Sequence, residues 1–100
     1  MDLRKFLLES GVYPNLKGYN FLIDAVKLVK ENPDMTLTKH LYPAVAELHN
    51  TTSSKVERAI RHVVTTRIKR TNYKKIGIET TPTNGEFIWF FAIIGGKKNG

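Results

Sequence analysis

The 100-residue chain contains no cysteine. Disulfide bonds, iron–sulfur clusters and zinc sites built on thiolates are therefore excluded. The three histidines, His40, His49 and His62, lack the spacing to nearby carboxylates that a metal site needs, and the serines cluster in one polar turn. We therefore expect no metal, no cofactor and no catalytic residue, and we do not expect an enzyme that acts on a small-molecule substrate.

Long hydrophobic runs are also missing. The longest, residues 87–94, has eight residues, whereas a membrane-spanning helix needs about 20. The first ten residues include Asp2 and Glu9 and contain no apolar stretch followed by small residues, so we expect neither a signal peptide nor membrane association. A chain of this length predicts one domain, over residues 1–96, followed by a disordered tail at 97–100.

Acidic residues are scarce in the second half of the chain. Residues 1–50 carry six basic and six acidic side chains, whereas residues 51–100 carry ten basic and three acidic ones, which accounts for the formal net charge of +7. Between residues 53 and 75, Glu57 is the one acid among eight cations: Lys55, Arg58, Arg61, Arg67, Lys69, Arg70, Lys74 and Lys75. Such a concentration favours a polyanionic partner such as nucleic acid. The alternative is that these cations only keep an exposed helix soluble.

Two short amphipathic segments lie in the middle of the chain, on either side of a polar corner. They predict paired helices whose apolar stripes face each other: Leu41, Val45, Ala46 and Leu48 in the first, and Val56, Ala59, Ile60, Val63 and Val64 in the second. Asn50 falls where the first helix ends and a left-handed residue is usual. In the corner, Ser54 and Glu57 have capping-box spacing, although Thr52 or Ser53 would serve equally well as the N-cap. The pattern predicts a helix-turn-helix.

The second of these helices, expected from about residue 53 to 69 or 70, is predicted to be buried on one side and cationic on the other. At about 100° per residue, the face opposite its apolar stripe carries Ser54, Lys55, Arg58, Arg61, His62, Thr65 and Lys69. A cationic helix fits the major groove of DNA, where Arg58 and Arg61 can bind guanine and Glu57 can accept from a cytosine amino group. Capping the helix is a role of similar weight for Glu57, and steadying Arg61 four residues further on is another.

Other segments complete an all-α fold of five to six helices. Residues 2–10 and 16–29 form apolar stripes at helical spacing, and the second stripe is wide enough to be the core element behind the helix-turn-helix. Residues 37–41 predict a helical segment with a kink or restart at Tyr42-Pro43, because proline cannot donate the bond that a continuous helix requires. Residues 71–82 are interpreted as a connection with one helical turn near 73–76, with a two-stranded wing from 76–78 as the alternative.

The last predicted helix covers residues 87–94. Thr83 and Glu86 have capping-box spacing before it, and Gly95-Gly96 ends it. Its residues are apolar almost all round, which is typical of a core helix. Because one helix of so small a domain can hardly bury every side, Phe87, Phe91 and Ile94 are candidates for a dimer interface.

Three separated motifs then point to a known family. GVYPNLKGYNFL, LYPAVAELHNTTSSKVERAIRH and PTNGEFI, in this order, resemble the C-terminal DNA-binding effector domain of the sporulation master response regulator, from about Gly11 to Ile88. The resemblance implies an all-helical domain that recognises a short DNA box of the TGNCGAA type, often in tandem copies occupied by a head-to-tail dimer. The regulator also carries a phosphoacceptor receiver domain, and no part of these 100 residues is expected to form one.

By this resemblance, the family's recognition helix maps onto the helix from about Ser53. Its contacting positions carry over to Lys55, Glu57, Arg58, Arg61 and His62, and the corner of Thr51, Thr52 and Ser53 falls at the phosphate backbone. Where the regulator carries an arginine, this chain has Lys55.

We therefore predict a sequence-specific, double-stranded-DNA-binding transcriptional regulator, located in the cytoplasm at the nucleoid. The predicted base-reading residues are Lys55, Glu57, Arg58 and Arg61, and the predicted phosphate-binding residues are Thr51, Thr52, Ser53, His62, Lys69, Lys74 and Lys75. A homodimer on tandem sites is a further expectation. The alternative is a protein-interaction module of the same fold that pairs with a full-length regulator through its apolar last helix.

Overall fold

The computed structural model describes residues 2–94, which form helices and no strand. The helices are α1 (Leu3–Glu9), α2 (Lys17–Glu31), α3 (Tyr42–Leu48), α4 (Ser53–His62), α5 (Arg70–Lys75) and α6 (Asn84–Trp89). Three π-helical turns extend them: η1 (Leu37–Leu41) leads into α3, η2 (Val63–Arg67) continues α4, and η3 (Phe90–Ile94) continues α6. The predicted all-α class is confirmed, and the alternative of a wing at 76–78 is wrong.

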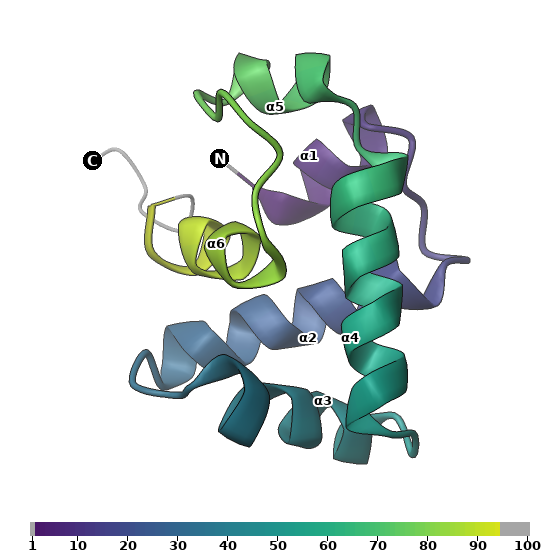
Figure 1. The fold of residues 1–100 in the computed structure, drawn as a ribbon, viewed down its shortest axis with the longest axis vertical. Helices are drawn as coiled ribbons and strands as arrows, with labels where there is room; N and C mark the ends of the chain where they lie inside the picture. The colour runs from purple at the N-terminus through teal and green to yellow at the C-terminus, as the bar shows by residue number, and fades with distance from the viewer. Residues whose placement is uncertain (1, 95–100) are drawn as a thin grey trace.

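Helix α2 lies at the centre of the molecule (Figure 1) and packs against α1, α3, α4 and α6. Its buried face comprises Gly18, Tyr19, Phe21, Leu22, Ala25, Val26 and Val29. This apolar stripe recurs at three- and four-residue spacing, so a single side of the helix supplies the surface onto which the others pack. The prediction that this helix forms the core behind the two central helices is confirmed.

Helices α2 and α4 come into close contact at Gly18. A Cβ atom added to Gly18 would lie 2.5 Å from Cγ2 of Val63 and 2.6 Å from the carbonyl oxygen of Ala59. The carbonyl belongs to the backbone of α4 and cannot rotate away as a side chain could. Glycine is therefore the residue that lets these two helices pack at this separation.

Helices α3 and α4 pack against each other and are joined by residues 49–52. Asn50 has a left-handed backbone (φ +53°), as predicted. The N–H groups of Asn50 and Thr51 donate back to the last turn of α3, which is the bonding of a Schellman motif. Thr52 then begins α4, because its hydroxyl accepts from the backbone N–H of Lys55 at 3.2 Å. Of the N-cap candidates in the corner, the structure therefore selects Thr52 and not Ser54.

Pro43 is accommodated in the first turn of α3, as expected. Leu41 and Tyr42 keep helical dihedral angles, so the chain passes from η1 into α3 without a break. The N–H of Tyr42 donates to the carbonyl of Leu37, five residues back. The π-helical turn thus lies next to the position where proline removes an ordinary helical bond.

Two predicted boundaries are wrong by a few residues. The helix formed by α4 and η2 ends at Arg67, because Ile68 adopts an extended backbone and buries its side chain against the core. Neither glycine nor proline marks this end, so the sequence carries no local stop signal. Helix α5 begins at Arg70, before the predicted turn at 73–76. The predicted stop at Gly95-Gly96 and the predicted tail at 97–100 lie outside the described residues.

Helix α6 and η3 close one side of the core. The predicted capping box is confirmed: the N–H of Glu86 donates to the Thr83 hydroxyl, and the N–H of Thr83 donates to the Glu86 carboxylate. The prediction of an interface at Phe87 and Phe91 is wrong, because both rings are fully buried among other aromatic rings, Phe6 included. Among residues 2–94, no helix is long and apolar enough to span a membrane.

Candidate nucleic-acid interface

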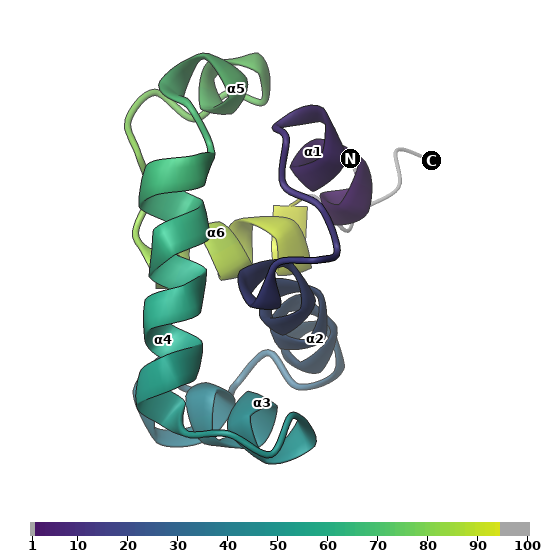
Figure 2. The same ribbon diagram turned by 90° about the vertical axis from the view of Figure 1, so that its right-hand side faces the viewer.

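Helices α4 and η2 form one edge of the molecule, with the other helices on one side only (Figure 2). Their 15 residues span roughly 20 Å at the usual helical rise. The inner side is buried through Val56, Ile60, Val63 and Val64. The outer side carries the predicted base-reading residues: Lys55, Arg58 and Arg61 are exposed, and Glu57 is half-buried. The structure thus places these four side chains on the part of α4 that is not packed against other helices.

Glu57 and Arg61 form an ion pair one helical turn apart. Nη1 of Arg61 donates to Oε2 of Glu57 at 2.9 Å. The Arg61 side chain is 56% and the Glu57 side chain 32% exposed. A pair this exposed contributes only about 0.2–0.5 kcal/mol to stability. Its main effect is to orient the Arg61 guanidinium along the outer face of α4. Of the roles considered for Glu57, the structure therefore shows the one that steadies Arg61.

Asn84, the first residue of α6, ties α4 to the rest of the fold. Its buried Nδ2 donates to the Tyr42 hydroxyl at 2.9 Å and to the backbone carbonyl of Glu57 at 3.2 Å. Burial raises the pKa of the Tyr42 phenol above its ordinary value, while the hydrogen bond to Asn84 opposes this shift. Asn84 was not predicted from the sequence, because the capping-box pattern locates the start of the helix and not the direction of this side chain.

The predicted phosphate-binding residues divide between the two ends of α4, one group in and beside the corner before α4 and the other in and beside α5. Thr51, Thr52 and Ser53 lie at its N-terminal end, and Lys69, Lys74 and Lys75 lie beyond its C-terminal end, at the start of α5 and in its last turn. All three lysines are exposed, as is His62 on α4 itself. The positive charges therefore extend beyond the length of the helix.

Tyr73 fixes α5 and its lysines at this end. Its hydroxyl donates to the backbone carbonyl of Val64, and its ring packs against Phe6 and Phe87. Burial raises the pKa of the Tyr73 phenol well above its ordinary value, so the hydroxyl keeps the proton that it donates. The contacts of Tyr73 therefore hold α5 in place, although the sequence of this segment shows only weak helical periodicity.

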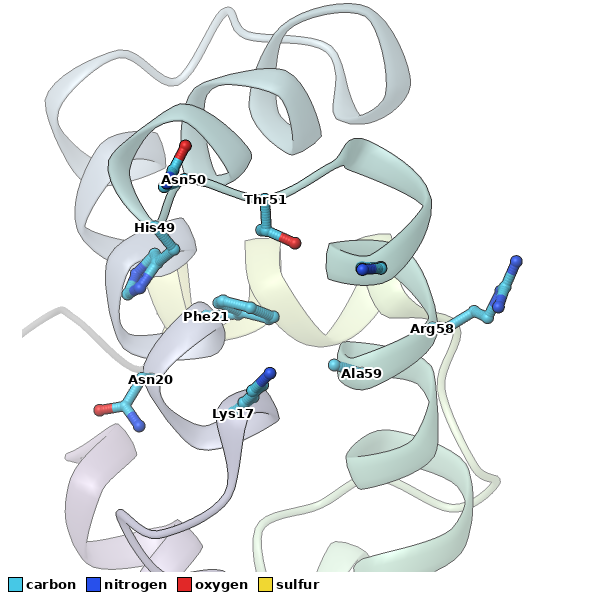
Figure 3. A pocket seen from close by; sticks show the side chains of 9 residues that line it. Lys17, Asn20, Phe21, His49, Asn50, Thr51, Arg58 and Ala59 are labelled. Atoms are coloured by element: carbon cyan, nitrogen blue, oxygen red, sulfur yellow. The ribbon is translucent and has the colours of Figure 1, made fainter.

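A hollow of about 550 Å³ lies between α2, the corner and the first two turns of α4 (Figure 3). Its lining comprises Lys17, Asn20, Phe21, His49, Asn50, Thr51, Lys55, Arg58 and Ala59. Lys17 extends from the start of α2 into the space between α2 and α4, while Arg58 points away from α2. Lys17 was not predicted from the sequence, because it belongs to the half of the chain whose charges balance.

His49 attaches the corner to α2. Its Nε2 lies 2.5 Å from Oδ2 of Asp24, and its ring meets the edge of Phe21 with a centroid separation of 4.9 Å. These two contacts join residues 25 or more positions apart in the chain. They hold the corner, and with it the N-terminal end of α4, against the central helix.

The family model described as "Sporulation initiation factor Spo0A C terminal" matches residues 3–93 of the chain. The chain belongs to this family. The match includes all six helices and extends the resemblance noted from about Gly11 to Ile88 toward both ends. Spo0A C-terminal domains are DNA-binding effector domains of a sporulation regulator, and they are not an enzyme family.

Proposed function

We propose that this Spo0A C-terminal domain binds double-stranded DNA at specific sequences and regulates transcription. Helices α3 and α4 act as a helix-turn-helix, with α4 in the major groove. The observation that carries the proposal is the exposed face of α4, where three cations and one carboxylate project from a helix whose inner side is locked to α2, α3 and α6. A rigid helix of this kind can hold several side chains in register with a base sequence.

Individual roles follow from the chemistry of the side chains. Arg58 and Arg61 are suited to bidentate hydrogen bonds with guanine O6 and N7, and Lys55 can donate to the same acceptors. Glu57 can accept from a cytosine amino group and hold the Arg61 guanidinium in place. The threonines and serine of the corner, His62, and the lysines at positions 69, 74 and 75 bind phosphates and set the register of the domain on the duplex.

The same family suggests that two domains occupy tandem boxes as a homodimer, and that the domain acts in the cytoplasm at the nucleoid. With Phe87 and Phe91 buried, the apolar surface that the last helix leaves for pairing is at η3, where Ile93 is 43% and Ile94 62% exposed. This exposure also supports the second candidate function, a module that pairs with a full-length regulator. The two candidates differ in whether the isolated domain binds DNA.

The test is the Arg58→Ala variant, titrated with a duplex carrying one TGNCGAA-type box and with a scrambled duplex. Loss of a bidentate contact should weaken binding to the box by about 1–3 kcal/mol and relax the preference at one guanine. Folding stability should change by less than about 0.5 kcal/mol, because the side chain points into solvent. An equal loss on both duplexes would make Arg58 a phosphate contact, and a wild-type domain with no preference for the box would refute the proposal.

A further inference from the structure

We infer that the hollow between α2 and α4 binds a phosphate of the DNA backbone, with Lys17 of α2 as its anchor. This inference rests on the proposed function. It extends the DNA-binding surface beyond the two helices of the motif, to a residue that neither the family match nor the sequence pattern singles out.

The two flanks of α4 differ in charge. The hollow on the α2 side is lined by no acidic residue and by three cations, Lys17, Lys55 and Arg58, of which Arg58 points away from α2 (Figure 3). On the opposite flank, a second hollow of about 520 Å³ is lined by Glu57 and Arg61, which pair with each other, and otherwise by uncharged residues. The uncompensated positive charge therefore lies on the flank that faces α2.

The shape of DNA brings this flank close to a phosphate backbone. The major groove is about 12 Å wide, so a helix inserted into it fills the groove and presents its flanks to the two phosphate backbones. The flank with Lys17 and Lys55 then faces one backbone along α4, with Lys55 near the start of this helix and Lys17 next to the close contact of Gly18 with Ala59.

Lys17 occupies an unfavourable position in its own helix. It is the first residue of α2, where a positive charge opposes the helix dipole, and the first turn contains no acid that would offset it. Within residues 2–94, the close contacts between basic and acidic side chains join His49 to Asp24 and Arg61 to Glu57, and neither involves Lys17. Among the described residues, the Lys17 ammonium therefore forms no ion pair and is available to an external anion.

The turn before α2 fixes where Lys17 projects. Nδ2 of Asn20 donates to the backbone carbonyls of Pro14 and Leu16, at 2.9 and 3.1 Å. These bonds hold the residues preceding Lys17 against the first turn of α2. The lysine stem therefore starts from an ordered backbone, and only its own rotamers must be restricted when it binds.

The experiment uses duplexes carrying one TGNCGAA-type box in which single phosphates are replaced, one at a time, by neutral methylphosphonate linkages. For wild-type protein, neutralising one or two of the phosphates that flank the box should reduce affinity severalfold. For the Lys17→Ala variant, neutralising one of these same phosphates should cause no further loss of affinity, because its contact is already missing. The variant's slope of log K against log salt should be shallower by about 0.9, equivalent to one phosphate contact. Lys27→Ala, which removes an exposed lysine of the same helix outside this hollow, should match wild type at every linkage.

The outcomes separate the inference from the function on which it rests. If Lys17→Ala and wild type respond identically at every linkage while the box is still preferred over a scrambled duplex, the inference is overturned and the proposed function stands. If wild type does not prefer the box, both are overturned. The thermal unfolding midpoint of the Lys17→Ala variant should equal or exceed that of wild type. This result would show that a loss of affinity does not come from unfolding of the domain.

Discussion

Replacing Gly18 by alanine tests the close packing of α2 on α4. Alanine is favoured over glycine inside a helix by roughly 0.5–1 kcal/mol, so a neutral site would gain stability. At Gly18 the new Cβ would lie 2.6 Å from the carbonyl oxygen of Ala59, and reaching an ordinary contact of 3.4 Å requires the α4 backbone to retreat by about 0.8 Å. Overpacking of this kind costs about 1–3 kcal/mol. We expect a net loss of about 1–2 kcal/mol after the gain in propensity is subtracted.

Gly85→Ala is the matched control. Gly85 also lies in a helix, but its added Cβ would meet only the end of the Leu37 side chain, at 3.4 Å. Its stability should therefore be unchanged or raised by up to about 1 kcal/mol.

Thermal unfolding followed by circular dichroism distinguishes the two variants. For a domain of this size, 1 kcal/mol corresponds to about 4–8 °C in Tm, so Gly18→Ala should unfold roughly 5–15 °C below wild type. Gly85→Ala should unfold at or above the wild-type temperature. If Gly18→Ala unfolded at or above the wild-type temperature, the close approach of α2 and α4 would be wrong.

Three further substitutions test other parts of the structure. Tyr73→Phe removes the donor to the Val64 carbonyl and should lower the free energy of unfolding in urea by about 0.5–1.5 kcal/mol, whereas loss of the exposed hydroxyl in Tyr13→Phe should change it little. Lys74→Ala should weaken binding equally on box and scrambled duplexes and reduce the salt slope by about 0.9, and an unchanged slope would make it a solvated surface charge. Ile94→Glu should reduce cooperative binding to two boxes while single-box affinity is kept, and loss of folding instead would place the side chain in the core.

The parts of the fold that the sequence predicts are those whose causes lie within a few residues. Asn50 adopts its left-handed backbone because of the local needs of a helix end, and Thr83 and Glu86 form a capping box because they lie three residues apart. Helical periodicity likewise separates the apolar and cationic faces of α4, so the candidate base-reading residues follow from their spacing along the chain.

The parts that sequence reasoning missed depend on partners distant in the chain. Phe87 and Phe91 are buried because α1, α2 and α5 surround them, which a pattern of consecutive apolar residues cannot reveal. Ile68 ends its helix because its side chain finds the core in an extended conformation. Lys17 joins a hollow beside α4 only because Gly18 lets the two helices touch. Local bonding therefore determined the helices and their charged face, and long-range packing decided which side chains remain exposed.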